Sequence, residues 1–440
     1  MDLLSVPAAS TVMRVRPPVR VSVLAFVAAM LLGSGAAQGQ MVANPFGASV
    51  GPRTEFDASV ALQMRGFPRQ GELGQDRFQP SVALEFTLRR DWNAGADSVT
   101  LAPFYRFDPG DDHRRRGDLR EAFYSHLGSG FELHAGLKRV FWGQTESKHL
   151  VDVLNQVDLI ENVNEEHRLG QPMLSLVLLR DWGVFEAFLL PGFRQRTFAS
   201  TDGRLSGPFA IDKASSGIRG VAKGQVDWAL RYSHLISDVE LGLSWFEGTN
   251  REPAFAVVAP VEPGVPIRLQ PQYGAMSQFG LDAALIRGDW AFKLEGVRRG
   301  GDAPRHLAAV LGIERTLVGV VGRADVGLLL EYLFDDRGRR TPLLSFANDV
   351  FAGIRIGFND LADSELLAGV IVDHRSGRQV WSLEGSTRIG QHWRLSAQAR
   401  AFVGVPALGA GDPAAVLEPG RQWGALVRDD YLELELIRFF

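Results

Sequence analysis

Apolar and polar residues alternate in one short segment after another along this 440-residue chain. The alternation runs through Phe56–Met64, Phe131–Leu137 and Leu395–Val403, and through Val82–Leu88 with one slip of register. A period of two places successive side chains on opposite faces of a β-strand, so each segment predicts a strand with one apolar and one polar face. The sequence therefore predicts an all-β fold.

The connections between these segments decide between a soluble sandwich and a membrane barrel, because both use strands with one apolar face. Short connections are expected near Asn93–Asp97, Gly128–Gly130, Asp181–Gly183, Ser237–Asp238, Gly288–Asp289, Gly322–Ala324, Asn359–Asp363 and Gly390–His392. Longer ones are expected near Pro68–Arg77, Pro109–Gly117, Gly143–Pro172, Ala199–Gln225, Gly248–Ala275, Arg299–Arg305, Asp335–Asn348, His374–Arg378 and Pro406–Asp429. Their alternation favours short periplasmic turns opposite long extracellular loops. His374–Arg378 is the marginal case, because it is no longer than some of the short connections.

The segments between these connections predict a single antiparallel transmembrane β-barrel of about 18 strands. The stretch Ser215–Asp238 is ambiguous, because Gly224–Asp227 reads as one more turn; sixteen strands is the alternative count. An even count places both chain ends on the periplasmic side.

Composition excludes several other classes of protein. With no cysteine, the chain has no disulfide framework, no thiolate metal site and no cysteine nucleophile. Its net charge of −4 gives no electrostatic reason to expect a nucleic-acid partner. Beyond the N-terminus it lacks the runs of about 20 apolar residues that helical membrane spans need.

The N-terminus has the pattern of an export signal. Arg14, Arg16 and Arg20 precede the apolar run 21–32, and small residues follow up to Ala37. A basic start, a short apolar stretch and a small-residue exit are typical of a cleaved signal peptide; an uncleaved anchor is the alternative. We predict a signal peptide over 1–37, a short periplasmic segment over 38–53 and a barrel over 54–440 located in the Gram-negative outer membrane.

The last strand carries alternate apolar residues and ends on an aromatic one: Leu432, Leu434, Leu436 and Phe440. This resembles the C-terminal signal of outer-membrane barrels, which the barrel-assembly machinery reads. Arg438 departs from that pattern. The resemblance implies the assembly machinery, outer-membrane lipid and lipopolysaccharide as partners.

The longest early connection, 143–172, contains an apolar stretch at 150–160 that is compatible with a short helix. An apolar segment is unfavourable in open water, so we expect it to fold into the lumen and narrow the pore. A lid across the mouth, or packing on other loops, is the alternative. The expected constriction residues are Trp142, Glu146, His149, Asp152, Asn155 and Asp158.

The same region carries a family resemblance. Phe141–Glu146 followed by Leu150–Asn155 resembles the Trp-Gly…Asp-x-x-Asn pattern of uncharacterised proteobacterial outer-membrane proteins, which are similar to alginate-export-type porins. The resemblance implies an outer-membrane channel of unknown cargo and carries over no catalytic residue.

Charged residues on the polar faces are the candidate pore lining. Strand parity predicts these cations to face inward: Lys138, Arg194, Arg231, Lys293, Arg355 and Arg400. The acids expected beside them are Glu85, Glu132, Glu295 and Glu331. Opposed basic and acidic walls select solutes by the electric field across the pore and by the width of the pore. Alternatively, the charges pair across strands and stabilise a closed lumen.

Two loop motifs have weaker readings. The run 113–116 (His-Arg-Arg-Arg) has side chains that could bind lipopolysaccharide phosphates. Alternatively, Asp108, Asp111 and Asp112 neutralise these arginines or bind calcium weakly. The third interpretation is an ordinary charged loop. Asp–His neighbours at 111–113 and 373–374 suggest a surface hydrolase, but no serine with a distinctive flanking pattern accompanies them. We predict no enzyme, metal site or cofactor.

Together these features predict an outer-membrane channel for passive diffusion of small polar or anionic solutes. The alternatives are an exporter of an amphipathic molecule or polysaccharide that works with a periplasmic partner, a surface hydrolase, and a purely structural barrel. The identity of the solute and the oligomeric state stay open.

We predict that deleting Phe440 blocks assembly, because the deletion removes the terminal aromatic residue of the recognition strand. The measurement is the amount of heat-modifiable protein in the outer membrane. A wild-type amount after the deletion would contradict the prediction.

Overall fold

The computed structural model describes residues 51–206, 209–213, 217–218, 226–258, 268–337, 348–405, 424 and 426–440. The predicted signal peptide lies outside these residues, as does most of the predicted periplasmic segment. Among the described residues no helix is long and apolar enough to span a bilayer. They include one short named helical element, the 3₁₀ turn η1 (Asn93–Gly95).

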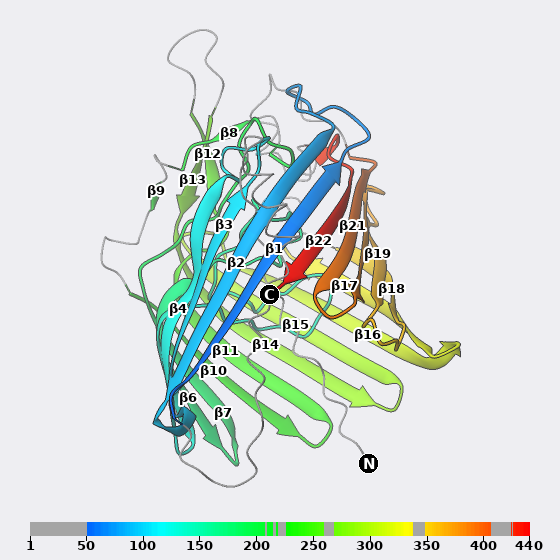
Figure 1. Cartoon of the computed structure of the whole chain (residues 1–440). Helices are drawn as coiled ribbons and strands as arrows, with labels where there is room; N and C mark the ends of the chain where they lie inside the picture. Colours follow the sequence, from blue (N-terminus) through cyan, green and yellow to red (C-terminus); the bar gives the residue numbers. More distant parts are fainter. Residues whose placement is uncertain are drawn as a thin grey trace.

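Eighteen antiparallel strands form one closed barrel (Figure 1). Its first nine strands are β1 (Arg53–Gly66), β2 (Phe78–Trp92), β3 (Asp97–Phe107), β4 (Arg116–Gly128), β5 (Phe131–Lys138), β6 (Gln171–Arg180), β7 (Gly183–Pro191), β10 (Val226–Ile236) and β11 (Val239–Thr249). The other nine are β14 (Ala275–Arg287), β15 (Trp290–Gly301), β16 (His306–Val321), β17 (Ala324–Asp335), β18 (Asp349–Gly357), β19 (Glu365–Asp373), β20 (Gln379–Ile389), β21 (Trp393–Val403) and β22 (Tyr431–Phe439). The predicted class and strand count are confirmed.

The ambiguous stretch Ser215–Asp238 contributes one strand, β10, to the barrel. Val226 and Asp227, expected at a turn in the 16-strand alternative, are the first residues of β10 and pair with Pro191 and Leu190 of β7. The alternative count of sixteen is therefore wrong.

Connections alternate between the two ends of the barrel, as predicted. At one end they are 93–96, 129–130, 181–182, 237–238, 288–289, 322–323, 358–364 and 390–392; we call this the short-turn end. At the other they are 67–77, 108–115, 139–170, 192–225, 250–274, 302–305, 336–348, 374–378 and 404–430. The contrast in length is not complete, because 302–305 is shorter than 358–364.

The barrel closes between its first and last strands. The register runs from Ser59 opposite Phe439 to Gly66 opposite Leu432, and the Phe440 N–H donates to Ala58 O over 3.0 Å. Closure leaves no free edge along this seam. Outward from β22 point the predicted assembly-signal residues Leu432, Leu434 and Leu436. Arg438 packs over the rings of Trp393 and Phe440, with its guanidinium carbon 5.4 and 4.8 Å from their centroids.

The outer face of the barrel is apolar and exposed. Phe56, Met64, Leu311 and Leu330 are each at least half exposed, and each lies on the side of its strand away from the lumen. Exposed apolar side chains on this many neighbouring strands are unfavourable in water and suit a hydrocarbon surrounding. The inner face carries the polar half of each alternation.

A small second sheet stands at the end of the barrel with the long connections (Figure 1). The hairpin β12 (Ala254–Val258) and β13 (Arg268–Tyr273) pairs in parallel with β8 (Ala210–Ile211) and β9 (Gly217–Ile218). It joins the β7–β10 and β11–β14 connections to each other.

Candidate functional site

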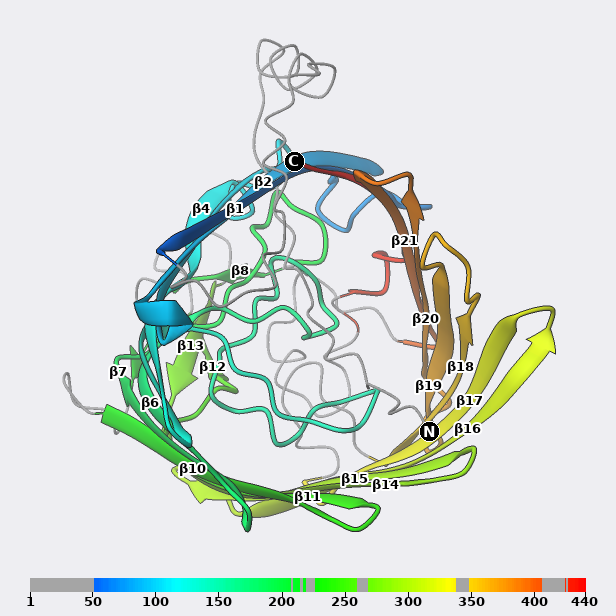
Figure 2. The same cartoon turned by 60° about the horizontal axis from the view of Figure 1, so that its bottom comes forward.

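The β5–β6 connection, residues 139–170, runs through the barrel interior (Figure 2), and we call it the lumen loop. Arg65 of β1 donates to Glu161 O over 2.9 Å, and Gln278 of β14 donates to Val151 O over 3.3 Å. β1 and β14 lie on opposite sides of the ring of strands in Figure 2, so the loop crosses the lumen.

The expectation of a short helix at 150–160 is wrong. The segment is irregular, with single β-bridges at Val157 and at Asp158, and every residue from 151 to 163 is buried. Val151 and Leu154 pack with side chains of β7, β14 and β15, whereas Val157 packs in a cluster with β20–β22. The mixed apolar spacing reflects a segment buried on two sides, where a helix would present one apolar stripe.

Asn155 closes the base of the lumen loop. Its amide nitrogen donates to Lys138 O over 3.0 Å and to Leu169 O over 2.8 Å, and its oxygen accepts the Val140 N–H over 2.9 Å. One fully buried amide thus joins the end of β5 to the start of β6.

Asp152 makes the second tie at this base. Its carboxylate accepts the Trp142 N–H over 3.4 Å and Nε of Arg168 over 2.8 Å. The Asp-x-x-Asn part of the sequence pattern therefore determines the shape of the loop, through contacts inside the loop itself.

Two carboxylates of the barrel wall hold the tip of the loop. Glu295 of β15 accepts hydrogen bonds from the N–H groups of Gln144, Thr145 and Val151 over 2.8, 3.1 and 3.1 Å, and from the Thr145 hydroxyl over 2.8 Å. Glu331 of β17 accepts the Glu146 N–H over 2.7 Å, and the Ser147 N–H and hydroxyl also donate to it. Both wall residues are buried, with 0% and 2% exposure.

The glycine of the Trp-Gly pair permits this approach. Gly143 has a φ of +154°, and a Cβ there would lie 3.0 Å from the Glu295 carboxylate and 2.9 Å from His149 Nδ1. His149 packs edge-on against Phe141 with ring centroids 4.7 Å apart. A side chain at 143 would push the loop off Glu295.

Arginines of β4 bind the middle of the loop. Asp158 is fully buried and pairs with Arg116, with Arg120 over 2.7 Å and with the Thr197 hydroxyl over 2.6 Å. The pairing of β3 with β4 shifts register at Pro103, which has no N–H to donate, and this shift inserts Arg120 as an extra residue. The bulge turns Arg120 toward the lumen.

A second acid of the loop meets the neighbouring strands. Glu161 forms an ion pair with Arg106 of β3, and Arg65 of β1, which donates to Glu161 O, also pairs with Glu433 of β22. A buried charge is tolerated when it is paired and hydrogen-bonded. These arginines therefore bind the loop to the wall and are hidden from a passing solute.

Sequence reasoning missed most of these anchors. Arg65, Arg106 and Arg120 occupy polar positions of predicted strands, and nothing local distinguishes a buried inward arginine from a wet one. Glu161 follows directly after the stretch 150–160, which was interpreted from its apolar residues alone. The sequence signal that could have indicated these contacts is the number of arginines on the first strands, together with the several acidic residues of the loop that they face.

The reading of run 113–116 as a lipopolysaccharide site is wrong for Arg114. That side chain is buried and donates to Asp108 over 2.8 Å and to Ile160 O over 3.0 Å. Asp111 accepts the N–H groups of His113 and Ser200. Burial raises the pKa of Asp108 and of Asp111 to about 6.

Across the described ranges, no three His, Asp or Glu side chains gather closely enough to hold a metal ion. Arg115 and Asp112 pair in the open over 3.0 Å, which leaves an ordinary charged rim at this point.

Five of the six predicted pore cations lie on inward-facing positions of strands, and four have carboxylate partners. The ion pairs are Arg231–Asp282 at 2.7 Å, Lys293–Glu314 at 2.9 Å, Arg355–Glu314 at 3.1 Å and Arg400–Glu384 at 2.8 Å. Arg355 also pairs with Glu146 of the lumen loop, and Lys138 lies 5.2 Å from the ring centre of Phe123.

The sixth cation lies elsewhere. Arg194 follows the end of β7 and donates to Asp118 over 2.7 Å and to Gly170 O over 3.1 Å, so it is on a loop and not on a strand. Glu132 faces inward beside His134, with 3.3 Å between Oε2 and Nε2. Glu85 is buried on the inner face of β2.

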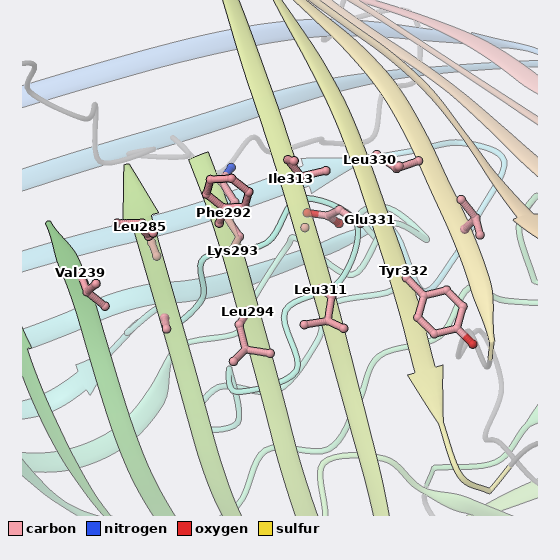
Figure 3. A pocket seen from close by; sticks show the side chains of 14 residues that line it. Val239, Leu285, Phe292, Lys293, Leu294, Leu311, Ile313, Leu330, Glu331 and Tyr332 are labelled. Carbon is pink, nitrogen blue, oxygen red and sulfur yellow. The ribbon is translucent and has the colours of Figure 1, made fainter. Parts of the chain in front are cut away.

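One cavity borders the lumen loop, and another lies outside the barrel. A polar one of about 60 Å³ lies between the loop and the β11–β14 connection, lined by charged residues that include Lys148, Glu165 and Glu252. The other, about 540 Å³, is an apolar groove on the outer face of β11–β18 (Figure 3), lined among others by Leu285, Phe292 and Leu311. We call it the outer groove.

Comparison with known proteins gives a likeness of fold. No family model matches the sequence, and no curated protein matches it. Pseudomonas aeruginosa OccK5 (OpdH) is similar over 89% of this chain and 97% of its own, with a TM-score of 0.48 and 9% identity. OccD3 (OpdP) of the same organism is similar over 89% and 92%, with a TM-score of 0.48 and 11% identity.

A mutant of the Rh. blastica porin is similar over 88% of this chain and all of its own, with a TM-score of 0.42 and 12% identity. These TM-scores are below 0.5 and the identities are low. The function therefore has to be argued from the chain's own residues.

We predict that the double substitution Glu295→Gln with Glu331→Gln frees the loop tip. Each glutamine removes a charged acceptor and turns an NH₂ group toward N–H donors, which costs about 1–3 kcal/mol per site. Hydrogen exchange of the amides at 144–147 and 151 should accelerate at least roughly tenfold. Glu240→Gln, at an exposed position of β11, is the matched control; equal protection in both proteins would contradict the assignment.

Proposed function

We propose that the chain is an outer-membrane channel through which small polar or anionic solutes diffuse passively. The closed barrel, its apolar outer belt and its polar inner face support this assignment. No energy coupling or cofactor is part of the proposal. Outer-membrane lipid and lipopolysaccharide would surround the belt, and the assembly machinery would read β22.

Exposed charge on the inner wall along β18–β21 is the observation that carries the proposal. Arg355 of β18 has 40% of its side chain exposed, and Glu384 of β20 and Arg394 of β21 are also partly exposed. Side chains of this kind need water, so a wet path along β18–β21 accounts for them. The lumen loop reaches this wall as well, through Glu146 at β18 and Val157 at β20–β22, and narrows that path.

A row of paired charges runs from β15 to β18 beside this path, and its signs are balanced. Lys293 and Arg355 share Glu314, and Arg355 also meets Glu146 of the loop. Alternating signs at a constriction favour polar solutes by field and width. The balance supports only a weak preference for anions, which would come from the exposed guanidinium of Arg355.

Export of a polysaccharide or amphipathic molecule is the second transport hypothesis, and the resemblance to alginate-export-type barrels belongs to it. A continuous exposed ladder of arginines would favour it. Here Arg65, Arg106 and Arg120 are buried beneath the loop with carboxylates close by, so they offer no such ladder to a polymer.

A hydrolase has one observation in its favour. The Ser125 hydroxyl lies 2.7 Å from His134 Nδ1, and His134 Nε2 lies 3.3 Å from Glu132. Ser125 is buried, however, and its backbone lies in the β4–β5 ladder, where N–H groups bond to the neighbouring strand. Acyl transfer needs free donors facing the nucleophile. We therefore assign Ser125, His134 and Glu132 to the polar lining of the lumen.

Single-channel conductance in a planar bilayer tests the channel, and deleting 148–165 tests the role of the loop. Wild-type protein should give stable steps, and the deletion should give larger ones, because it removes the segment that crosses the lumen. The arginines left behind would face a wider aqueous lumen and regain hydration.

If folded wild-type protein gives no conductance steps, a purely structural barrel would be favoured. Unchanged conductance after the deletion would place the segment outside the ion path. Heat-modifiability of both proteins controls for folding.

Arg355→Gln should shift the reversal potential toward cation preference. The change removes the exposed lumen cation and leaves Glu146 and Glu314 without that partner, so the anion-to-cation permeability ratio should fall by about twofold in a screened, wet lumen. Arg315→Gln is the control, because Arg315 points outward and packs over Trp290. A similar shift in both variants would contradict the role of Arg355.

A further inference from the structure

We propose that the outer groove binds one molecule of an anionic phospholipid, with an acyl chain in the groove and the phosphate between Arg287 and Arg315. This goes beyond the passage of solutes through the lumen, because the site lies on the opposite face of the sheet. It requires a barrel in a bilayer and no open pore.

Two unbroken rows of residues that pair across neighbouring strands line the outer groove. The first row is Leu285, Phe292, Ile313 and Leu330. The second row, two residues away along each strand, is Ala283, Leu294, Leu311 and Tyr332. No charged residue interrupts either row, and Figure 3 shows members of both rows on neighbouring strands. The surface is therefore continuous and apolar.

Both rows lie on the lipid side of the sheet. Lys293 and Glu314 form an ion pair on the lumen side. Because successive side chains of a strand alternate, their sequence neighbours Phe292, Leu294 and Ile313 lie on the outer face. In Figure 2 the β16–β17 hairpin stands out from the ring of strands, and the outer face is hollowed beside it.

The outer groove has room for a lipid chain. Its volume is about 540 Å³, whereas an apolar cavity of about 150 Å³ already holds one benzene molecule. An empty groove would leave its lining without contacts on one side. In a bilayer, a hydrocarbon chain is the molecule at hand to fill it.

A third row, on the short-turn side of the groove, carries positive charge. It is Arg287, Trp290, Arg315 and Leu328. The Arg315 guanidinium carbon lies 5.1 Å from the Trp290 ring centre, and tryptophan is typical of the level at which hydrocarbon meets headgroups. The two arginines stand two strands apart, about 10 Å. Both long side chains can therefore reach one phosphate beside Trp290.

Neither Arg287 nor Arg315 forms an ion pair with an acid in the part of the chain that the structure describes. The outward positions of β14–β17, all of them described, hold no Asp or Glu. Phosphate is an acceptor that a guanidinium binds through two parallel hydrogen bonds. Two unpaired cations favour a lipid with a net negative charge over a zwitterionic one.

A second copy of the chain matches this face less well than a lipid does. A twofold axis would place the same patch on both copies. Arginines would then meet arginines or apolar side chains, because the patch has no acid of its own. The two arginines stand at the short-turn end, and short turns face the periplasm in outer-membrane barrels. The lipid is therefore a phospholipid of the periplasmic leaflet.

Native mass spectrometry of the refolded protein tests the proposal. The protein is offered equal amounts of phosphatidylglycerol and phosphatidylcholine with the same palmitoyl and oleoyl chains, so that the two lipids differ in headgroup charge alone. We expect one phosphatidylglycerol per barrel, preferred at least roughly tenfold. Arg287→Gln with Arg315→Gln should abolish the preference. A wild-type barrel that retains neither lipid, or both equally, would overturn the proposal.

The matched control is Arg90→Gln with Arg298→Gln, which removes the same charge from two other outward positions. Arg90 lies at the short-turn end of β2, away from the groove, and Arg298 lies at the opposite end of β15 from Trp290. The control should keep the preference for phosphatidylglycerol. Equal loss in both double variants would reveal a general attraction of charge and overturn the site.

Ala283→Phe tests the groove separately, because it places a ring in the groove and keeps both arginines. Retention of phosphatidylglycerol should fall at least roughly tenfold, since the chain loses its apolar contacts. Wild-type retention in this variant would overturn a chain seated in the groove. Dimers that form through this face without lipid would assign it to a second copy instead.

The measurement needs no current, so its outcome is separate from that of the conductance experiment. Heat-modifiability shows that each variant is folded before lipid is added. A barrel that binds phosphatidylglycerol but conducts no ions would refute the channel and support the lipid site.

Discussion

Closure of the sheet is the constraint on which everything else in this molecule depends. A strand surrounded by hydrocarbon has no water to satisfy its N–H and C=O groups, so every strand needs a partner on both sides. Here β22 supplies the last partner for β1, and the Phe440 N–H extends that pairing to Ala58. Once the ring is closed, the polar face of each strand has only the lumen to face.

The enclosed polar faces create a second requirement, which the lumen loop meets. Arginines of β3 and β4 would be costly to bury alone, and Glu161 and Asp158 bring carboxylates to them. Arg65 of β1 donates to the backbone oxygen of Glu161. On the opposite wall the roles are reversed, because Glu295 and Glu331 receive backbone N–H groups of the loop. The loop and the barrel thus complete each other's hydrogen bonds, and neither set of charges remains for a solute.

The fold was largely predictable because a period of two and alternating connections are local features. The class, the count of eighteen strands and the alternation of the ends are confirmed. The prediction of a short helix at 150–160 is wrong. A segment buried on two sides has the same apolar composition as an amphipathic helix, but its apolar residues do not follow the helical spacing. The pairing of Glu295 with residues about 150 positions away has no local signature, so sequence reasoning placed Glu295 on the inner wall without its partners. The roles of the pore-lining residues stay predictions.

The Asn155 tie has a consequence for the order in which the molecule is assembled. Asn155 contacts Lys138, Val140 and Leu169, and Asp152 contacts Trp142 and Arg168, so the base of the loop is shaped by contacts within about thirty residues. Local contacts form before distant ones. The wall strands that carry Glu295 and Glu331 come later in the chain, so their contacts with the loop are the ones that close long stretches of chain. The lumen loop thus gives the second half of the barrel an interior segment to pack against.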